Sequence, residues 1–207
     1  MKVLIACEFS GVVRTAFEVI GHDAVSCDLL PSELPGKHYQ GNVMDIINNG
    51  WDMMIAHPPC TDLAVSGSRY FSKKIKSGVQ QKSIDFFLSL VNAPIARIAI
   101  ENPVCIMSSL YRKPDQIIQP FDFGHFESKK TCLWLKNLPP LISTKPCVLP
   151  GCGHWDNQTL NRQNKLLIDG KWIAFNDPRT AYARSKTYQG IADIMANQWG
   201  FEKGVII

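Results

Sequence analysis

The sequence predicts an α/β protein with a Rossmann-like fold: a mostly parallel sheet, helices on both of its faces, and a small irregular insert. The first observation is that short apolar runs of strand length recur along the chain. Such runs are typical of strands buried on both faces of a parallel sheet. The second is that segments with the apolar spacing of helices lie between these runs. The third is that turn or polar residues follow the runs, as at the ligand-binding edge of an open sheet.

Length, charge and cysteine content set the general class of the protein. The chain has 207 residues, seven cysteines and a formal net charge of +4, which suits one domain with a small appendage and is compatible with a polyanionic partner. No apolar run approaches the roughly 18 residues that span a bilayer. The first residues, Met1–Ala6 followed by Glu8, lack the pattern of a signal peptide. The odd number of scattered cysteines argues against a disulfide framework, so we expect a cytoplasmic protein without membrane association.

The first predicted unit is a strand at Lys2–Cys7, a turn at residues 8–11 and a helix at Val12–Ile20. Such a unit offers backbone N–H groups and a helix N-terminus to an anionic group of a ligand. Of the glycine pattern that binds dinucleotides, only Gly11 is present. An ordinary strand-to-helix turn therefore remains the alternative.

Two acidic residues follow near the same edge of the predicted sheet. The second strand, Ala24–Cys27, ends at Asp28, where an acid accepts hydrogen bonds from ribose hydroxyls. Asp45 follows shortly after the turn at Gly41 and is a candidate acceptor for an adenine amino group. Capping of the short segment that follows is the alternative for Asp45.

The run at residues 51–56 leads directly into His57-Pro58-Pro59-Cys60. The prolines fix φ and donate no backbone hydrogen bond, so the strand cannot continue. Cys60 is therefore expected at the carboxyl end of a buried strand, where open sheets bind ligands. A small buried cysteine without chemistry is the alternative.

Residues 61–78 have no clear core pattern and carry a basic centre between two glycines. We expect a mobile lid that contacts phosphates, with a solvated surface loop as the alternative. Its candidate nucleic-acid contacts are Ser66, Arg69, Lys73 and Lys74. Helical spacing resumes over Gln80–Val91.

The next apolar strand, Arg97–Ile100, ends in Glu101-Asn102-Pro103. Parallel strands present their carboxyl ends at one edge, so Glu101 and Asn102 are expected at the same edge as Cys60. A carboxyl group beside an apolar strand end should have a raised pKa, which suits a proton donor.

The remaining sequence is less regular. Residues 104–137 are expected to alternate loops with one strand, Cys132–Leu135. From Pro139 to Arg184 the periodicity fades, which predicts an irregular insert facing a partner. Tyr188–Trp199 has the spacing of a last amphipathic helix.

Metal binding is not predicted. Cys147, Cys152 and His154 could supply three ligands, but their spacing fits no standard zinc pattern and no fourth ligand is obvious.

Cys60 in Pro-Pro-Cys and Glu101 in Glu-Asn-Pro resemble two motifs of the DNA cytosine-5 methyltransferases. In that family a Pro-Cys loop carries the nucleophile and a Glu-Asn-Val segment carries the acid. Residues 8–11 resemble its S-adenosylmethionine turn. Residues 123–131 resemble a degenerate form of its Gln-x-Arg-x-Arg segment, and residues 184–192 its C-terminal motif. The resemblance covers residues 1–137 and 184–200.

The resemblance implies a methyltransferase form of the fold. Residues 1–137 would be the catalytic and cofactor-binding domain, 138–183 a target-recognition insert, and 184–207 a C-terminal helix that returns to the catalytic domain. It further implies transfer of a methyl group from S-adenosyl-L-methionine to C5 of a flipped-out cytosine in DNA, through a covalent bond from Cys60 to C6. Glu101 would act at N3 of the ring, and Asn102 would hold the loop.

Site residues follow from the same resemblance. The cofactor-binding residues would be Glu8, Phe9, Ser10, Gly11, Asp28, Asp45, Pro58 and Thr187. Lys129 and Thr131 would join the nucleic-acid contacts of the basic segment. The compact size is typical of phage or mobile-element enzymes, and we expect a monomer or weak dimer.

Three departures from the family pattern are visible. The glycine-rich first motif is reduced to Gly11, and Lys129 and Thr131 stand where the family has two arginines. The stretch 138–183 is much shorter than the usual target-recognition region, so sequence selectivity would be slight or would come from a partner protein.

Three other readings remain. An amino-methyltransferase is one, because His57-Pro58-Pro59-Cys60 is close to an Asp/Asn/Ser-Pro-Pro-aromatic motif. The same chemistry on a free cytosine nucleotide or RNA is another. A catalytically silent nucleic-acid-binding relative is the third.

Overall fold

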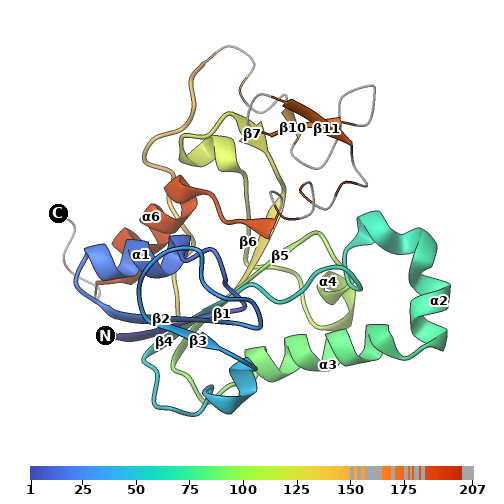
Figure 1. Cartoon of the computed structure of the whole chain (residues 1–207), viewed down its shortest axis with the longest axis horizontal. Helices are drawn as coiled ribbons and strands as arrows, with labels where there is room; N and C mark the ends of the chain where they lie inside the picture. The colour runs from blue at the N-terminus through green and yellow to red at the C-terminus, as the bar shows by residue number, and fades with distance from the viewer. Residues whose placement is uncertain are drawn as a thin grey trace.

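The computed structural model contains one seven-stranded sheet with the strand order β3-β2-β1-β4-β5-β8-β6 (Figure 1). The structure describes residues 1–149, 152, 155–156, 165–168, 171–174, 177, 179, 182 and 185–201. The strands of the sheet are β1 (Lys2–Ala6), β2 (Asp23–Asp28), β3 (His38–Gln40), β4 (Met53–Ala56), β5 (Arg97–Pro103), β6 (Gln116–Ile118) and β8 (Thr131–Lys136). The first five pair in parallel, whereas β8 runs antiparallel to both β5 and β6.

Helices cover both faces of this sheet (Figure 1). Helix α1 (Val12–Val19) packs against α6 (Gln189–Trp199) on one face, and α3 (Val79–Val91) lies on the other. Both faces are apolar because successive strand residues point to opposite sides. The predicted Rossmann-like α/β class is therefore confirmed.

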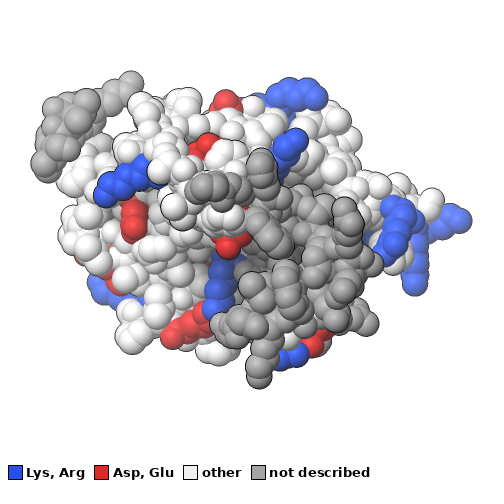
Figure 2. All heavy atoms as spheres, turned by 90° about the horizontal axis from the view of Figure 1, so that it is seen from above, with Lys and Arg blue, Asp and Glu red and all other residues white. Residues whose placement is uncertain are grey.

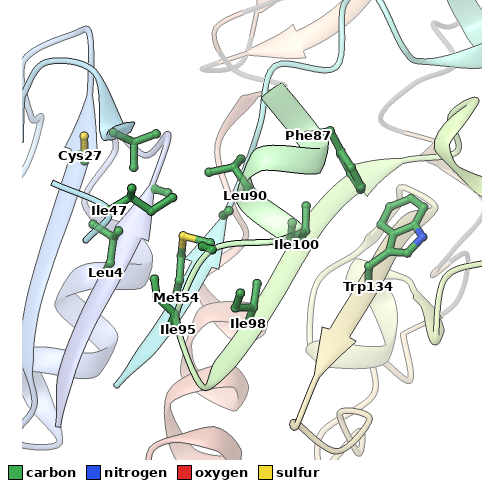
Figure 3. Packing of buried hydrophobic residues seen from close by; sticks show 14 of the residues in the cluster. Leu4, Cys27, Ile47, Met54, Phe87, Leu90, Ile95, Ile98, Ile100 and Trp134 are labelled. Atoms are coloured by element: carbon green, nitrogen blue, oxygen red, sulfur yellow. The ribbon is translucent and has the colours of Figure 1, made fainter. Parts of the chain in front are cut away.

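The two faces have separate cores. Ile5 and Ile55 pack with Phe17 of α1 and Trp199 of α6. The alternate strand residues Leu4, Met54, Ile98 and Ile100 pack with Phe87 and Leu90 of α3 and with Trp134 of β8 (Figure 3). This alternation explains why the runs read as continuously apolar in the sequence.

Several short elements were not foreseen. The predicted lid is helical, as η2 (Val65–Tyr70) and α2 (Phe71–Lys76). Between β5 and β8 the chain forms α4 (Met107–Leu110), β6, η3 (Pro120–Phe123) and β7 (Glu127–Ser128). Within the predicted irregular insert lie β9 (Trp155–Asp156), which pairs with β7, and the hairpin of β10 (Lys165–Ile168) and β11 (Lys171–Ala174). A last short element, η1 (Val43–Asp45), precedes β4.

Cysteine pairing departs from the expectation at one point. Cys147 and Cys152 form a disulfide, with their Cα atoms 6.1 Å apart. The other five cysteines are thiols. In the part of the chain that the structure describes, no helix combines the length and apolar character needed to cross a bilayer.

Candidate active site

The turn after β1 is closed by a buried carboxyl group. Glu8 is 4% exposed, and its carboxylate accepts the backbone N–H groups of Val13 (2.7 Å) and Arg14 (3.2 Å) at the start of α1. Burial raises the pKa of Glu8, against the opposing effects of the nearby positive charge of His57 and of these N–H donors. The expectation that these N–H groups are offered to a ligand is wrong for Val13 and Arg14, because Glu8 already occupies them.

Arg14 fixes the loop that follows β2, a role that sequence reasoning missed. Its guanidinium is fully buried and donates to Ser26 Oγ and Ser32 Oγ, each at 3.1 Å, and to the carbonyl oxygens of Leu34 and Pro35. Gly11 lies against the same guanidinium at a φ of 75°, and a Cβ atom there would lie 2.8 Å from Arg14 Nη2. Glycine is therefore required at this turn by packing as well as by its backbone conformation.

Asp28 and Asp45 lie at the edge of the sheet where β2 and β3 end. Asp28 Oδ1 accepts the backbone N–H of Leu30 at 2.9 Å. Asp45 lies within η1, where its carboxylate accepts the hydroxyl of Tyr39 at 3.2 Å. The alternative that Asp45 caps a helix after it is wrong, because Asp45 is the last residue of η1 and the residues directly after it form a turn.

The loop that carries Cys60 is tied to the end of β5. Asn102 is 1% exposed, and its Nδ2 donates to the carbonyl oxygen of Pro58 at 2.9 Å. The carbonyl oxygen of Cys60 accepts the N–H groups of Leu63 and Ala64, at 3.0 and 2.8 Å. Cys60 itself is half-buried. The structure therefore holds Cys60 and the end of β5 at one edge of the sheet.

His57 and Glu101 form a close pair at the same edge. Ala56 of β4 pairs with Ile100 of β5, so the next residue on each strand lies beside the other. His57 Nδ1 is 2.6 Å from Glu101 Oε2, and both side chains are largely buried. In the sequence, His57 stands out only as part of a stretch that is close to the motif of the amino-methyltransferases. Its place directly after β4 is the signal that could have found this pair.

The charge state of this pair reverses an expectation. Burial alone would raise the pKa of Glu101, but its hydrogen bond to His57, with the positive charges of His57 and Lys129, lowers it from 4.5 to about 2. For His57, burial favours the neutral ring, yet the bond and charge of Glu101 and the charge of Glu8 raise its pKa overall. Glu101 is therefore ionised at neutral pH, and the predicted raised pKa of a proton donor is wrong.

A small cavity brings the first turn and the C-terminal segment together. It is lined by Cys7, Glu8, Phe9, Ser10, His57, Ser185 and Thr187. Thus Glu8, Phe9, Ser10 and Thr187, assigned to the cofactor from the sequence, share one site with His57. The cavity measures about 10 Å³, room for about one water molecule.

This edge carries donors and acceptors that suit S-adenosyl-L-methionine. Asp28 and Asp45 present carboxylates for hydroxyl and amino groups, Ser10 and Thr187 present hydroxyls, and His57 Nε2 is buried without a hydrogen-bond partner in the described chain. Small-molecule pockets usually measure about 300 Å³ or more. The residues therefore fit the cofactor in chemistry, whereas the cavity is smaller than the cofactor.

The basic arm, which we define as residues 65–76 in η2 and α2, projects from the body of the molecule (Figure 1). Lys and Arg side chains gather at its far end (Figure 2). Lys74 is anchored, because its Nζ donates to the carbonyl oxygen of Thr61 and lies 3.1 Å from Asp62 Oδ1. Ser66 and Lys73 are exposed, and the guanidinium of Arg69 lies 4.7 Å from the ring centre of Tyr70.

The two remaining nucleic-acid candidates differ from each other. Lys129 lies close enough to Glu101 and His57 to influence both pKa values. Thr131 is 3% exposed, and its hydroxyl donates to the carbonyl oxygen of Lys129 at 3.0 Å. The side chain of Thr131 is therefore buried and its hydroxyl is bonded within the chain, whereas Lys129 lies beside the pair of His57 and Glu101.

No metal centre is found in the described residues. Of the three weighed zinc ligands, Cys147 and Cys152 bond to each other, and His154 lies outside the described residues.

Comparisons with known proteins give structural similarity only. No protein-family model and no curated protein matches the sequence. One similar structure is a protein encoded within an E. coli prophage and assigned as a DNA modification methyltransferase, with 15% identity and a TM-score of 0.43 over 65% of this chain and 46% of that one. Another is the Entamoeba histolytica methyltransferase EhMeth, with 16% identity and a TM-score of 0.49 over 80% of this chain and 62% of that one. The chain thus spans less than two thirds of either protein.

Proposed function

We propose that this protein is an S-adenosyl-L-methionine-dependent DNA cytosine-5 methyltransferase. One observation carries the proposal: a cysteine loop follows β4, a buried carboxylate lies near the end of the adjacent parallel strand β5, and the Asn102–Pro58 hydrogen bond ties the two strand ends together. This arrangement supports a reaction in which Cys60 and Glu101 act on one pyrimidine ring.

The chemistry needs a nucleophile because C5 of cytosine is too weakly nucleophilic to attack a methyl sulfonium. The thiolate of Cys60 adds to C6, which makes C5–C6 a single bond and moves the electron pair into a C4–C5 enamine whose C5 is nucleophilic. S-adenosyl-L-methionine, when bound, supplies an electrophilic methyl group at C5. Loss of the C5 proton to a base and cleavage of the C6–sulfur bond then restore the aromatic ring and the free thiolate.

The low pKa of Glu101 defines its part in this reaction. An ionised carboxylate accepts a hydrogen bond from N3 once that nitrogen is protonated, and it stabilises the positive charge that the ring carries during addition. Glu101 is thus an electrostatic partner of the ring, whose N3 takes its proton from solvent water and returns it when the C6–sulfur bond breaks. Asn102 keeps the cysteine loop at the correct distance from the strand end.

DNA is the proposed substrate. A cytosine in a duplex must leave the stack before Cys60 can reach C6, at a cost of a few kcal/mol. The basic arm supplies Arg69 and Lys73 for the phosphates beside the flipped nucleotide. Residues 138–183 are the proposed target-facing part, with a partner protein as the further source of selectivity.

The test is covalent trapping on a DNA duplex that carries 5-fluorocytosine. Fluorine at C5 blocks the elimination step, so the wild-type protein with S-adenosyl-L-methionine should form a denaturant-resistant adduct at Cys60, detectable by gel shift and peptide mass. Cys60→Ser should form none, and Cys105→Ser, which changes a buried neighbour, is the matched control. Absence of an adduct on DNA would contradict the proposal, and release of tritium from C5 of free dCMP but not of DNA would redirect it to nucleotides.

A further inference from the structure

The basic arm, residues 65–76, exposes large apolar side chains as well as charged ones. Tyr70 is 51% exposed, Ile75 63% and Val65 46%. Neither η2 nor α2 buries a residue, so these side chains do not stabilise the fold by packing into a core. Apolar side chains that gather on an exposed, projecting element (Figure 1) are typical of a surface that contacts a partner.

The charge of the arm indicates the kind of partner. Arg69, Lys73, Lys74 and Lys76 belong to it, and the sequence contains no acidic residue from position 63 to position 84. Lys and Arg side chains gather at the far end of the arm (Figure 2). A surface of one sign attracts polyanions, and the polyanion that also offers flat apolar faces to an aromatic ring is a nucleic acid.

Tyr70 and Arg69 form a pair on the surface of the arm. The guanidinium carbon of Arg69 lies 4.7 Å from the centre of the Tyr70 ring, within the range of a cation–π interaction, and both side chains are exposed. An aromatic ring stacks on any nucleobase, because every base has a π-face. A paired base inside a duplex already stacks on its neighbours, so this pair suits a strand whose bases are unpaired.

The arm is tied to the loop that carries Cys60. Lys74 Nζ donates to the carbonyl oxygen of Thr61 and lies 3.1 Å from Asp62 Oδ1. From α3, Gln80 Nε2 donates to the carbonyl oxygen of Asp62 at 3.0 Å. A strand that binds the arm is therefore held at a fixed place relative to the cysteine loop.

We propose that Tyr70, with Arg69, is a stacking platform for an unpaired base, and that the substrate is single-stranded or locally unpaired DNA. The choice of DNA rests on the proposed function. Lys73 and Lys76 contact the phosphates of the same strand. The cytosine to be modified then lies in a strand that is already open, which lowers the cost of bringing it to Cys60.

A membrane surface is the competing partner, because basic segments with apolar side chains also bind anionic lipids. Helix α2 carries three lysines among its six residues, which leaves little apolar surface to enter a lipid interface. The exposed ring of Tyr70 beside a guanidinium is the feature that favours a nucleobase.

The experiment measures binding of the full chain, without cofactor, to two labelled strands by fluorescence anisotropy. One is a strand of about 20 deoxythymidines, and the other is a strand of abasic sites with the same number of phosphates. Neither contains cytosine, so no reaction at Cys60 contributes to binding. The wild-type protein should bind the thymidine strand at least about 5-fold more tightly, the lower end of the effect of one stacked base.

The variants separate stacking from charge. Tyr70→Leu should lose most of this preference, bind the abasic strand within about twofold of wild type, and keep the wild-type salt slope, because a neutral ring neutralises no phosphate. Tyr70→Trp should retain the preference. Tyr111→Leu is the matched control and should behave as wild type, since Tyr111 is an exposed tyrosine beside Arg112 that lies outside the arm. Because η2 buries no residue, Tyr70→Leu should melt at the wild-type temperature.

Equal wild-type affinities for the two strands, or a preference that survives in Tyr70→Leu, would overturn the proposal. Tighter binding to a duplex of the same length would overturn the unpaired substrate, and tighter binding to an oligouridine strand would overturn the choice of DNA. Stronger binding to vesicles of phosphatidylcholine and phosphatidylglycerol than to the thymidine strand would show a membrane surface instead.

These outcomes are distinct from failure of the proposed function. Adduct formation on 5-fluorocytosine without a preference for the thymidine strand would leave the methyltransferase and remove the platform. A preference that depends on Tyr70 without an adduct would leave the platform and remove the methyltransferase.

Discussion

The polar side chains at the sheet edge are buried and bonded, whereas those of the basic arm are not buried. At the ends of β4 and β5, His57, Glu101 and Asn102 are buried or nearly so, and each is bonded to another part of the edge. In the basic arm, residues 65–76, no side chain is buried. A buried polar group without its partner costs far more than an exposed one. Substitutions at the edge should therefore change folding stability and chemistry together, whereas those at the exposed, unanchored positions of the arm should change binding alone.

The largest effect is expected for Glu101→Gln. Removing one member of a buried ion pair leaves the charge of His57 uncompensated, which typically costs about 3 kcal/mol of unfolding free energy. The turnover should also fall roughly 100- to 1,000-fold, because the protonated ring loses its partner. Urea denaturation and single-turnover methylation measure the two effects. Asp23→Asn, which breaks the exposed ion pair with Lys37, is the control and should change little.

The pH dependence sharpens this prediction. The folded-state pKa of Glu101 is lowered, so its contribution to the free energy of unfolding is present above pH 4.5 and is lost as pH falls towards about 2. The folded-state pKa of His57 is raised, so its contribution to the same free energy is present below about pH 6.5 and is lost as pH rises through the folded-state pKa. The difference in melting temperature between wild type and Glu101→Gln should therefore be greatest near pH 5 to 6. A difference that does not vary with pH would contradict the ion pair.

A smaller effect is expected for Asn102→Ala. The substitution leaves the carbonyl oxygen of Pro58 without its donor, but it also removes Asn102 Oδ1, a buried atom with no hydrogen-bond partner in the described chain. The net loss should be about 1 kcal/mol, measured by urea denaturation. Asn197→Ala is the matched control, because Asn197 Nδ2 also donates to a backbone carbonyl oxygen, that of Asp193, but in an exposed position. Equal losses of unfolding free energy in the two variants would show that the buried hydrogen bond at the sheet edge stabilises the fold no more than the exposed one does.

The contrast between the buried sheet edge and the exposed arm also explains which features the sequence could predict. Runs such as 51–56 and 97–100 predicted buried strands correctly, because one hydrophobic pattern serves both faces of a parallel sheet. The same reasoning placed Cys60, Glu101 and Asn102 at one edge. It predicted the pKa of Glu101 in the wrong direction, since burial is local in the sequence whereas the partner His57 is 44 residues away.

Other features escaped prediction for related reasons. Arg14 lies within an apolar helix pattern, and its five partners belong to β2, to the loop after β2 and to its own helix. Nothing periodic marks such a contact in the sequence. The arm was expected to be a mobile loop, because η2 and α2 bury no residue and therefore show no helical stripe.

The smallest effects are expected within the arm, where two lysines separate anchoring from binding. Lys74 is bonded to the Cys60 loop through Thr61 and Asp62, whereas Lys73 and Lys76 are exposed. The double variant Lys73→Gln, Lys76→Gln should melt at the wild-type temperature and bind duplex DNA a few-fold more weakly. The slope of log affinity against log salt should fall by about 2, since each lost phosphate contact removes about 0.9.

Lys74→Gln should instead lower the melting temperature slightly, because it releases the arm from the cysteine loop. Fluorescence anisotropy at several salt concentrations and a thermal melt distinguish the two variants. An unchanged salt slope in the double variant would remove the arm from the DNA interface and leave the sheet edge as the carrier of function.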